Sequence, residues 1–73
     1  MAKQLSRDTA RKRLLSMPPE QRTILLQQCG DVRHTVRHIL IDDMTAEQYG
    51  KRFKCNGPAM LEIALERVSR VLG

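Results

Sequence analysis

The chain of 73 residues is predicted to fold as an all-α domain, a small bundle of four to five helices. Apolar residues recur at helical spacing along most of the chain, and no stretch alternates as a β-strand does. Residues that cap helices stand where these apolar patterns begin. A chain of this length forms one domain with a modest core. We therefore expect a single helical domain over residues 6–73, preceded by a disordered, flexible basic arm over residues 1–5.

The first part of the chain is predicted to form two helices. Ser6 caps the first helix, and Pro18 and Pro19 end it because proline lacks an N–H group and restricts the residue before it. Pro19 also suits the first turn of the second helix, and Gly30 is a natural stop after it. The apolar residues of these two helices are Leu14, Leu15, Met17, Ile24, Leu25 and Leu26.

A third helix is predicted over residues 32–41, and Asp31 is expected to cap it. Its apolar residues lie on one face of a helix, which predicts a buried stripe. The members of the stripe are Val32, Val36, Ile39 and Leu40. The polar pair Asp42-Asp43 then marks a linker.

The segment over residues 45–73 is predicted to be a helix-turn-helix. Thr45 and Gln48 form a capping box at its start, and Asn56 is a good cap for its second helix. Gly50 has no side chain, so the second helix can approach closely there. The usual apolar positions of the motif fall on Tyr49, Phe53, Cys55, Met60 and Ile63. Lys54 occupies the turn position at which glycine commonly takes a positive φ.

The net charge of +5 indicates an acidic or polyanionic partner, and the charge is unevenly placed. Solvated charge explains any one basic residue, but clusters predict docking surfaces. Residues 1–13 carry a net charge of +4, and residues 51–54 carry +3. The basic residues of these two clusters are Lys3, Arg7, Arg11, Lys12 and Arg13, and Lys51, Arg52 and Lys54.

Composition and motifs exclude several classes of protein. No secretory signal or apolar run of ~20 residues is present, so we expect a cytoplasmic protein that does not enter membranes, in the host cytoplasm if a phage encodes it. Cys29 and Cys55 lie outside any paired motif, which favours two reduced thiols over a disulfide. No catalytic constellation or phosphate loop appears at a usable spacing, so we expect no enzyme and no cofactor.

The spacing of two histidines raises the question of metal binding. His34 and His38 stand four residues apart on the third predicted helix, as metal-binding histidines often do. Together with Cys29 and Cys55 they match no standard zinc spacing, so no metal site is predicted. We instead group the histidines with Arg33 and Arg37 on a polar helix face that contacts phosphate or an acidic protein. The sequence assigns no further role to Cys29, His34 and His38.

A resemblance to a known family is carried by two segments. LLSMPPEQRTILLQQ, followed by FKCNGPAMLEIALERVSRVL, resembles region 4 of bacterial sigma factors. In that family a Leu-Pro-Pro-Glu-Gln-Arg segment leads a helix, and a Gly-Cys-Ser turn precedes the recognition helix. Pro18 to Arg22 match the first element, Lys54 to Asn56 match the second loosely, and residues 31–43 form an extra stretch between them. From Ile39 onward the chain is also similar to plasmid repressors of the KorA/TrfB type. Both resemblances imply a role in transcription and a helix-turn-helix.

The final helix is a poor candidate for reading base edges. Of its outward positions near the start, only Asn56 suits a base contact, and Glu62 would face the phosphates. Four apolar residues instead form a second seam at spacings of four, three and four, which we interpret as a partner-binding surface. These residues are Leu61, Leu65, Val68 and Leu72. A single broad core face is the alternative interpretation.

Two functions are therefore predicted. The first is a transcription regulator of phage type that binds bacterial RNA polymerase through the basic arm and the seam. It interferes with sigma-dependent initiation or modulates termination, and small phage-encoded polymerase regulators are similar in size and charge. The second is a small repressor that binds DNA as a homodimer through Leu65, Val68 and Leu72 of the seam. A structural role as a helical adaptor is a third interpretation. The residues expected to contact DNA are Arg33, Arg37, Lys51, Arg52, Lys54 and Asn56.

Overall fold

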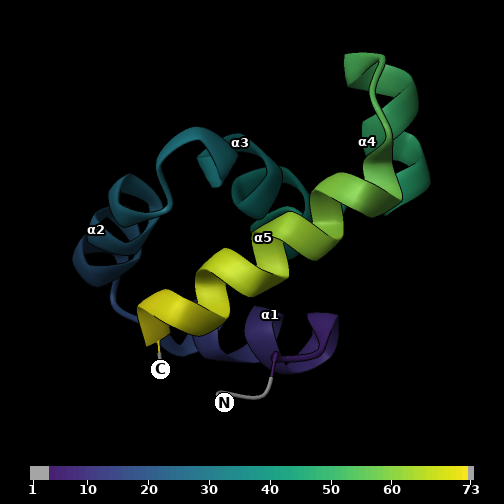
Figure 1. Cartoon of the computed structure of the whole chain (residues 1–73). Helices are drawn as coiled ribbons and strands as arrows, with labels where there is room; N and C mark the ends of the chain where they lie inside the picture. The colour runs from purple at the N-terminus through teal and green to yellow at the C-terminus, as the bar shows by residue number, and fades with distance from the viewer. Residues whose placement is uncertain (1–3, 73) are drawn as a thin grey trace.

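The computed structural model describes residues 4–72, and over this range the chain is helical without a β-strand. The predicted all-α fold class is confirmed (Figure 1). Five α-helical segments occur in this range, together with a 3₁₀ turn, η1, and a π-helical segment, η2. Their order is α1 (Arg7–Ser16), α2 (Pro19–Gln28), η1 (Gly30–Val32), α3 (Arg33–Thr35), η2 (Val36–Ile41), α4 (Ala46–Phe53) and α5 (Gly57–Leu72).

Three of the helices begin at the caps that the sequence predicts. The Ser6 hydroxyl accepts a hydrogen bond from a backbone N–H at the start of α1. Thr45 and Gln48 form both halves of the capping box of α4. The Asn56 side chain accepts from the backbone N–H three residues later, at the start of α5. Each cap satisfies an N–H group that has no partner inside its helix.

The connection from α2 to α3 differs from the prediction. Gly30 ends α2 as expected, in the left-handed conformation with φ of 63°. Asp31, however, caps no helix, because the chain leaves Gly30 through the η1 turn and α3 begins at Arg33 without a side-chain cap. The Asp31 carboxylate instead lies 3.6 Å from the guanidinium of Arg67 on α5.

The predicted third helix is divided between α3 and η2. Its buried stripe is confirmed, but from Val36 the segment winds as a π-helix. The Asp42 N–H bonds to the Arg37 carbonyl five residues earlier, at 2.9 Å. The carbonyls that end η2 receive hydrogen bonds from Arg11 of α1, at 2.7 and 3.0 Å. Because these donors come from another helix, the sequence pattern of the segment alone does not reveal the wider winding.

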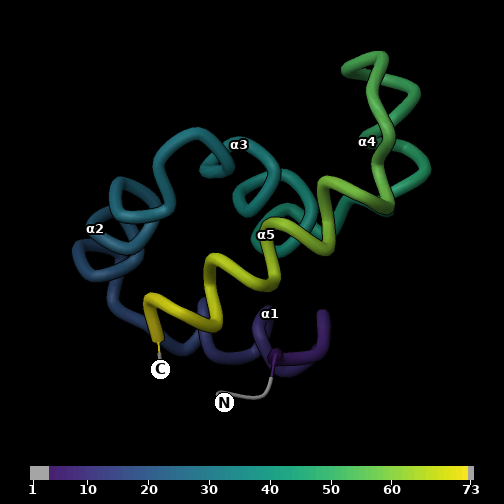
Figure 2. Tube along the Cα trace, viewed as in Figure 1, coloured from purple at the N-terminus to yellow at the C-terminus, as the bar shows by residue number. Residues whose placement is uncertain are grey.

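Helix α5 runs through the middle of the fold (Figures 1 and 2). It contacts α1, α2, α3, α4 and both η segments, and its buried residues meet those of the other elements in one cluster. That cluster consists of Ala10, Leu14, Leu25, Cys29, Val32, Val36, Ile39, Leu40, Tyr49, Ala64, Leu65 and Val68. The core is therefore built around α5, with α1 on one side of it and α3 on the other.

The α4–α5 pair is two helices joined by the three-residue turn that the sequence predicts. Lys54 takes the left-handed conformation with φ of 53°, at the position usually held by glycine. A Cβ atom on Gly50 would lie 2.8 Å from the Cys55 carbonyl oxygen, and one on Gly57 would overlap the Ala46 carbonyl. The two helices are thus in backbone contact, as expected at Gly50. The assignment of this pair to the helix-turn-helix class stays a prediction.

Several predicted core positions are on the surface. Ile24 is 53% exposed and Leu15 is 46% exposed, and Phe53 and Ile63 are each 44% exposed. Cys55 is also exposed, so Tyr49 is the one predicted apolar position of the motif that is fully buried. Figure 1 shows that α4, which carries Phe53, lies at an end of the molecule.

Within residues 4–72, no helix combines the length and the apolar character that crossing a membrane requires.

Candidate functional site

The basic residues of α1 fall into two groups in the structure. Arg7 lies 3.0 Å from the Asp43 carboxylate, and Arg11 lies 3.8 Å from it. Both guanidinium groups also donate to carbonyls at the end of η2. These two arginines form tertiary contacts within the fold and keep part of their side chains exposed, so their role as docking residues stays a prediction. Lys3 lies outside the described residues, and Leu5 packs against the core and donates its N–H to Ser69.

The other two predicted docking residues of α1 remain on the surface. Lys12 and Arg13 are exposed and form no ion pair with any carboxylate among residues 4–72. Leu15 is also exposed on α1 and Ile24 is exposed on α2, so these two side chains lie on either side of the Pro18–Pro19 link along the chain. We call Lys12, Arg13, Leu15 and Ile24 the elbow surface.

Arg22 fixes the angle between α1 and α2. Its guanidinium donates to the carbonyl oxygens of Leu14 and Met17, at 3.1 and 3.0 Å. These carbonyls belong to the end of α1, where helical partners run out. The junction of α1 and α2 is therefore bridged by a charged group from α2.

The apolar seam predicted on α5 is part of the core. Leu65 is 8% exposed and Val68 is fully buried, while Leu61 and Leu72 are half-buried against the core. The prediction of a second, outward seam is corrected, because α5 is covered on several sides rather than one. Of the residues proposed for a homodimer, Leu65 and Val68 are buried and Leu72 is half-buried, and the homodimer itself stays a prediction.

A row of rings crosses from the core to the surface near the end of α4. Tyr49 is buried, and its hydroxyl shares a hydrogen bond of 2.9 Å with that of Thr35. The Phe53 ring lies 4.7 Å from the Tyr49 ring and 5.1 Å from the His38 ring, measured between centroids. His38 in turn lies 6.4 Å from the exposed, nearly parallel ring of His34.

Cations border this row of rings. The Arg52 guanidinium lies 5.9 Å above the Phe53 ring, within range of a cation–π contact. Arg33, Arg37 and His34 line a hollow of about 110 Å³ with Leu26 beneath them. We call the surface made by Arg33, His34, Arg37, His38, Arg52 and Phe53 the ring face.

The basic residues predicted to contact DNA form no internal ion pair over residues 4–72. Each is exposed, and their charges act outward toward solvent or a ligand. These residues are Arg33, Arg37, Lys51, Arg52 and Lys54. The sixth predicted residue, Asn56, already uses its side-chain oxygen to cap α5, which leaves its amide hydrogens for a ligand.

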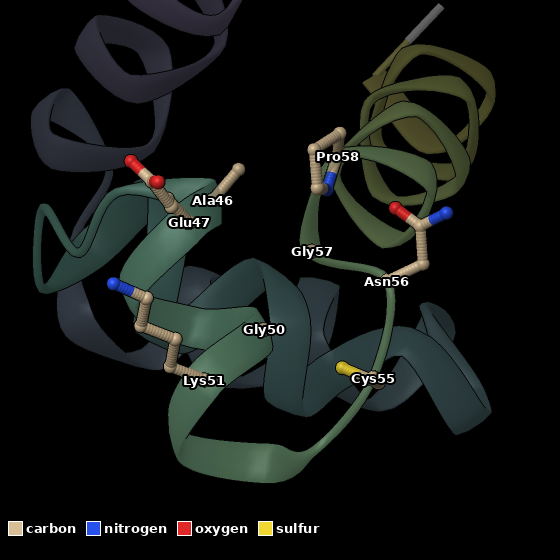
Figure 3. Close-up of a pocket in the computed structure, with 8 residues that line it drawn as sticks. All are labelled: Ala46, Glu47, Gly50, Lys51, Cys55, Asn56, Gly57 and Pro58. Atoms are coloured by element: carbon tan, nitrogen blue, oxygen red, sulfur yellow. The ribbon is translucent and has the colours of Figure 1, made fainter.

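A cleft of about 310 Å³ lies between α4 and the start of α5 (Figure 3). Glu47 and Lys51 stand on its α4 side, and Asn56 and Pro58 stand on its α5 side. The Cys55 thiol lies at the turn. Over the described range, no three side chains of His, Cys, Asp or Glu come together as metal ligands. The cleft offers polar contacts but no evident pairing of a nucleophilic side chain with a general base.

Cys29 is the other thiol, and it belongs to the core. Burial raises the pKa of its thiol above the ordinary value of 9.0, and the charge of Arg67 opposes this in part. Arg67 also donates to the Cys29 carbonyl at 3.0 Å. Cys29 is thus a packing residue, whereas Cys55 is open to reagents.

Sequence reasoning missed the exposure of Leu15, Ile24 and Phe53. Apolar spacing places all three on faces that could pack, and the absence of a covering helix is visible only in the fold. The spacing of Tyr49 and Phe53 did predict that their rings meet.

Comparisons with protein-family models, with curated proteins and with solved structures find no significant match to this chain.

Proposed function

We propose that this protein is a transcription regulator that docks on bacterial RNA polymerase through the elbow surface. In this role it interferes with sigma-dependent initiation or modulates termination. The observation that carries the proposal is the exposure of Leu15 on α1 and Ile24 on α2, within the segment that resembles sigma region 4, together with the exposed Lys12 and Arg13 on α1. Such a surface is complementary to an apolar patch bordered by carboxylates on a larger protein.

The assignment moves the docking surface away from the residues named by the sequence. Leu65 and Val68 are buried, and Arg7 and Arg11 already bond to other parts of the fold, so we do not place these four residues at the centre of the contact. Lys12 and Arg13 keep the role predicted for them. Apolar side chains on α1 and α2 replace those on α5 as the centre of the contact.

Affinity capture from a bacterial lysate, with and without nuclease, tests this function. We expect the tagged protein to retain polymerase subunits after nuclease treatment. The double variant Leu15→Glu/Ile24→Glu should lose them, because it places two charges at the centre of the contact. Ile63→Glu is the matched control, since Ile63 is similarly exposed but lies on α5. Retention by the double variant, or equal loss by the control, would count against the elbow surface.

A second function is supported by the exposed cations that form no ion pair with a carboxylate in the described range. A repressor that binds duplex DNA would place Arg33, Arg37, Lys51, Arg52 and Lys54 on phosphates and Asn56 on a base edge. Its affinity would fall steeply with salt, because each phosphate contact releases counterions. The start of α5 argues for weak sequence reading, since Gly57, Pro58 and Ala59 carry no hydrogen-bonding side chain.

Titration of duplex DNA at several salt concentrations tests the second function. Tight binding with a steep salt slope, together with no polymerase retained after nuclease, would favour the repressor over the polymerase regulator.

A further inference from the structure

We infer that the ring face binds a single-stranded polynucleotide, with bases stacked on its exposed rings and phosphates held by Arg33, Arg37 and Arg52. The inference is independent of polymerase docking, because the ring face and the elbow surface share no residue. Figure 1 shows α3 and α4 in the upper half of the view, away from the junction of α1 and α2.

The first argument is the position of the rings. Phe53 is 44% exposed although its neighbour Tyr49 is buried, so the row of rings continues from the core out to solvent. His38 bridges Phe53 to the exposed His34. Tyr49 is tied to Thr35 by its hydroxyl, which anchors the row between α4 and α3. A rigid row of partly exposed rings is a surface on which a flat base can stack.

The second argument is the charge around the rings. Arg52 lies over Phe53, and Arg33 and Arg37 lie beside His34. None of these arginines pairs with a carboxylate over residues 4–72. The nearby acid is Asp42, whose carboxylate is 3.8 Å from His38. Rings bordered by free arginines suit a chain that alternates flat bases with phosphates.

The third argument separates a single strand from the other polyanions. In a duplex the base faces are covered by their neighbours, so exposed rings gain nothing from the bases and the arginines alone contribute. The carboxylates of an acidic protein surface pair with the arginines but do not stack on Phe53 and His34. A single strand uses both the rings and the cations, because its bases are free to unstack.

Fluorescence anisotropy with labelled strands of about 12 nucleotides tests the inference on the full chain. The probes are oligouridylate, oligothymidylate, and a DNA duplex of matched length. We expect both single strands to bind more tightly than the duplex. The ratio of the affinities for the two single strands shows whether the ring face prefers RNA or DNA. Tighter binding of the duplex would overturn the inference.

Two sets of variants separate the rings from the charges. Phe53→Leu should weaken binding roughly tenfold and leave its salt dependence unchanged, because a ring releases no counterions. The double variant R33Q/R37Q should reduce the slope of log affinity against log salt by about 1.4. K12Q/R13Q removes the same charge at the elbow surface and should reduce the slope far less. Equal effects of the two double variants, or no effect of Phe53→Leu, would overturn the inference.

A substitution that keeps a ring provides a direct signal of stacking. The chain contains no tryptophan, so Phe53→Trp introduces a single indole emitter at the ring face. We expect it to bind at least as well as the parent, and its emission to be quenched as oligouridylate is added. Circular dichroism shows whether each variant keeps its helices. A folded Phe53→Trp variant that binds without any change in emission would contradict base stacking.

Discussion

Gly57 is the residue at which α4 and α5 come closest. A Cβ atom there would overlap the Ala46 carbonyl, and no flexible side chain is available to move aside. Alanine normally stabilises a helix relative to glycine. At this position the steric overlap of a Cβ atom should outweigh the helix propensity of alanine, because the obstacle is the backbone of another helix.

We expect Gly57→Ala to lower the free energy of unfolding by about 2 kcal/mol or more, since overpacking forces the backbone to shift. Ala59→Gly is the control, because Ala59 is exposed in the same helical turn and its replacement should cost only about 0.5–1 kcal/mol. Urea denaturation measures both. Equal stability of Gly57→Ala and the parent would show that the helices can separate without penalty.

The two cysteines should differ in reactivity because one is buried and one exposed. A disulfide-exchange reagent at mildly alkaline pH should modify Cys55 rapidly and reach Cys29 only on unfolding. Cys55→Ser should abolish the rapid phase, and Cys29→Ser should leave it intact. Two rapidly reacting thiols in the native parent would contradict the burial of Cys29.

The same burial implies a dependence of stability on pH. Because burial raises the pKa of Cys29, the folded state holds the thiol proton more tightly than the unfolded state does. The resulting stability is fully present below the ordinary pKa of 9.0 and is lost as the pH rises through the folded value. Relative to the parent, Cys29→Ala should show a smaller loss of melting temperature above that pH.

At the scale of elements, η2 is the segment that depends most on its neighbours. Its terminal carbonyls are satisfied by the guanidinium of Arg11, which stands about thirty residues earlier on α1. A hydrogen bond from a charged donor contributes more than a neutral one. The π-helical winding is thus supported by a tertiary contact rather than by local propensity.

We expect Arg11→Met to destabilise the fold by about 2 kcal/mol, because it leaves the carbonyls of Leu40 and Ile41 without their donor. Arg13→Met makes the same chemical change at an exposed residue without an ion pair in the described range, and should have little effect. Urea denaturation gives the difference, and amide exchange over residues 36–42 locates it. Faster exchange confined to other segments would argue against this role of Arg11.

At the scale of the whole molecule, α5 is the central helix of the core and does not present an outward seam to a partner. Leu65 lies in the core, whereas Ile63 on the same helix is half exposed. Leu65→Glu should therefore unfold the protein, because it buries a charge without a partner. Ile63→Glu should remain folded. Circular dichroism distinguishes the two, and a folded Leu65→Glu variant would restore the outward seam as a binding surface.

The sequence by itself determined the fold class, the caps of α1, α4 and α5, and the buried stripe of residues 32–41. Capping and helical periodicity are local, so Ser6, Thr45, Gln48 and Asn56 act as their spacing predicts. It also determined which residues are basic, and five of those proposed for DNA remain free on the surface.

Only the tertiary structure decided which apolar and charged residues remain available. Leu65 and Ile24 are both large apolar residues on helices, yet packing covers the first and leaves the second exposed. Arg11 and Arg13 are equally basic, yet of the two only Arg11 donates to the carbonyls at the end of η2. The physical reason is that burial and pairing depend on what lies across the core, and helical periodicity carries no information about the helix on the other side.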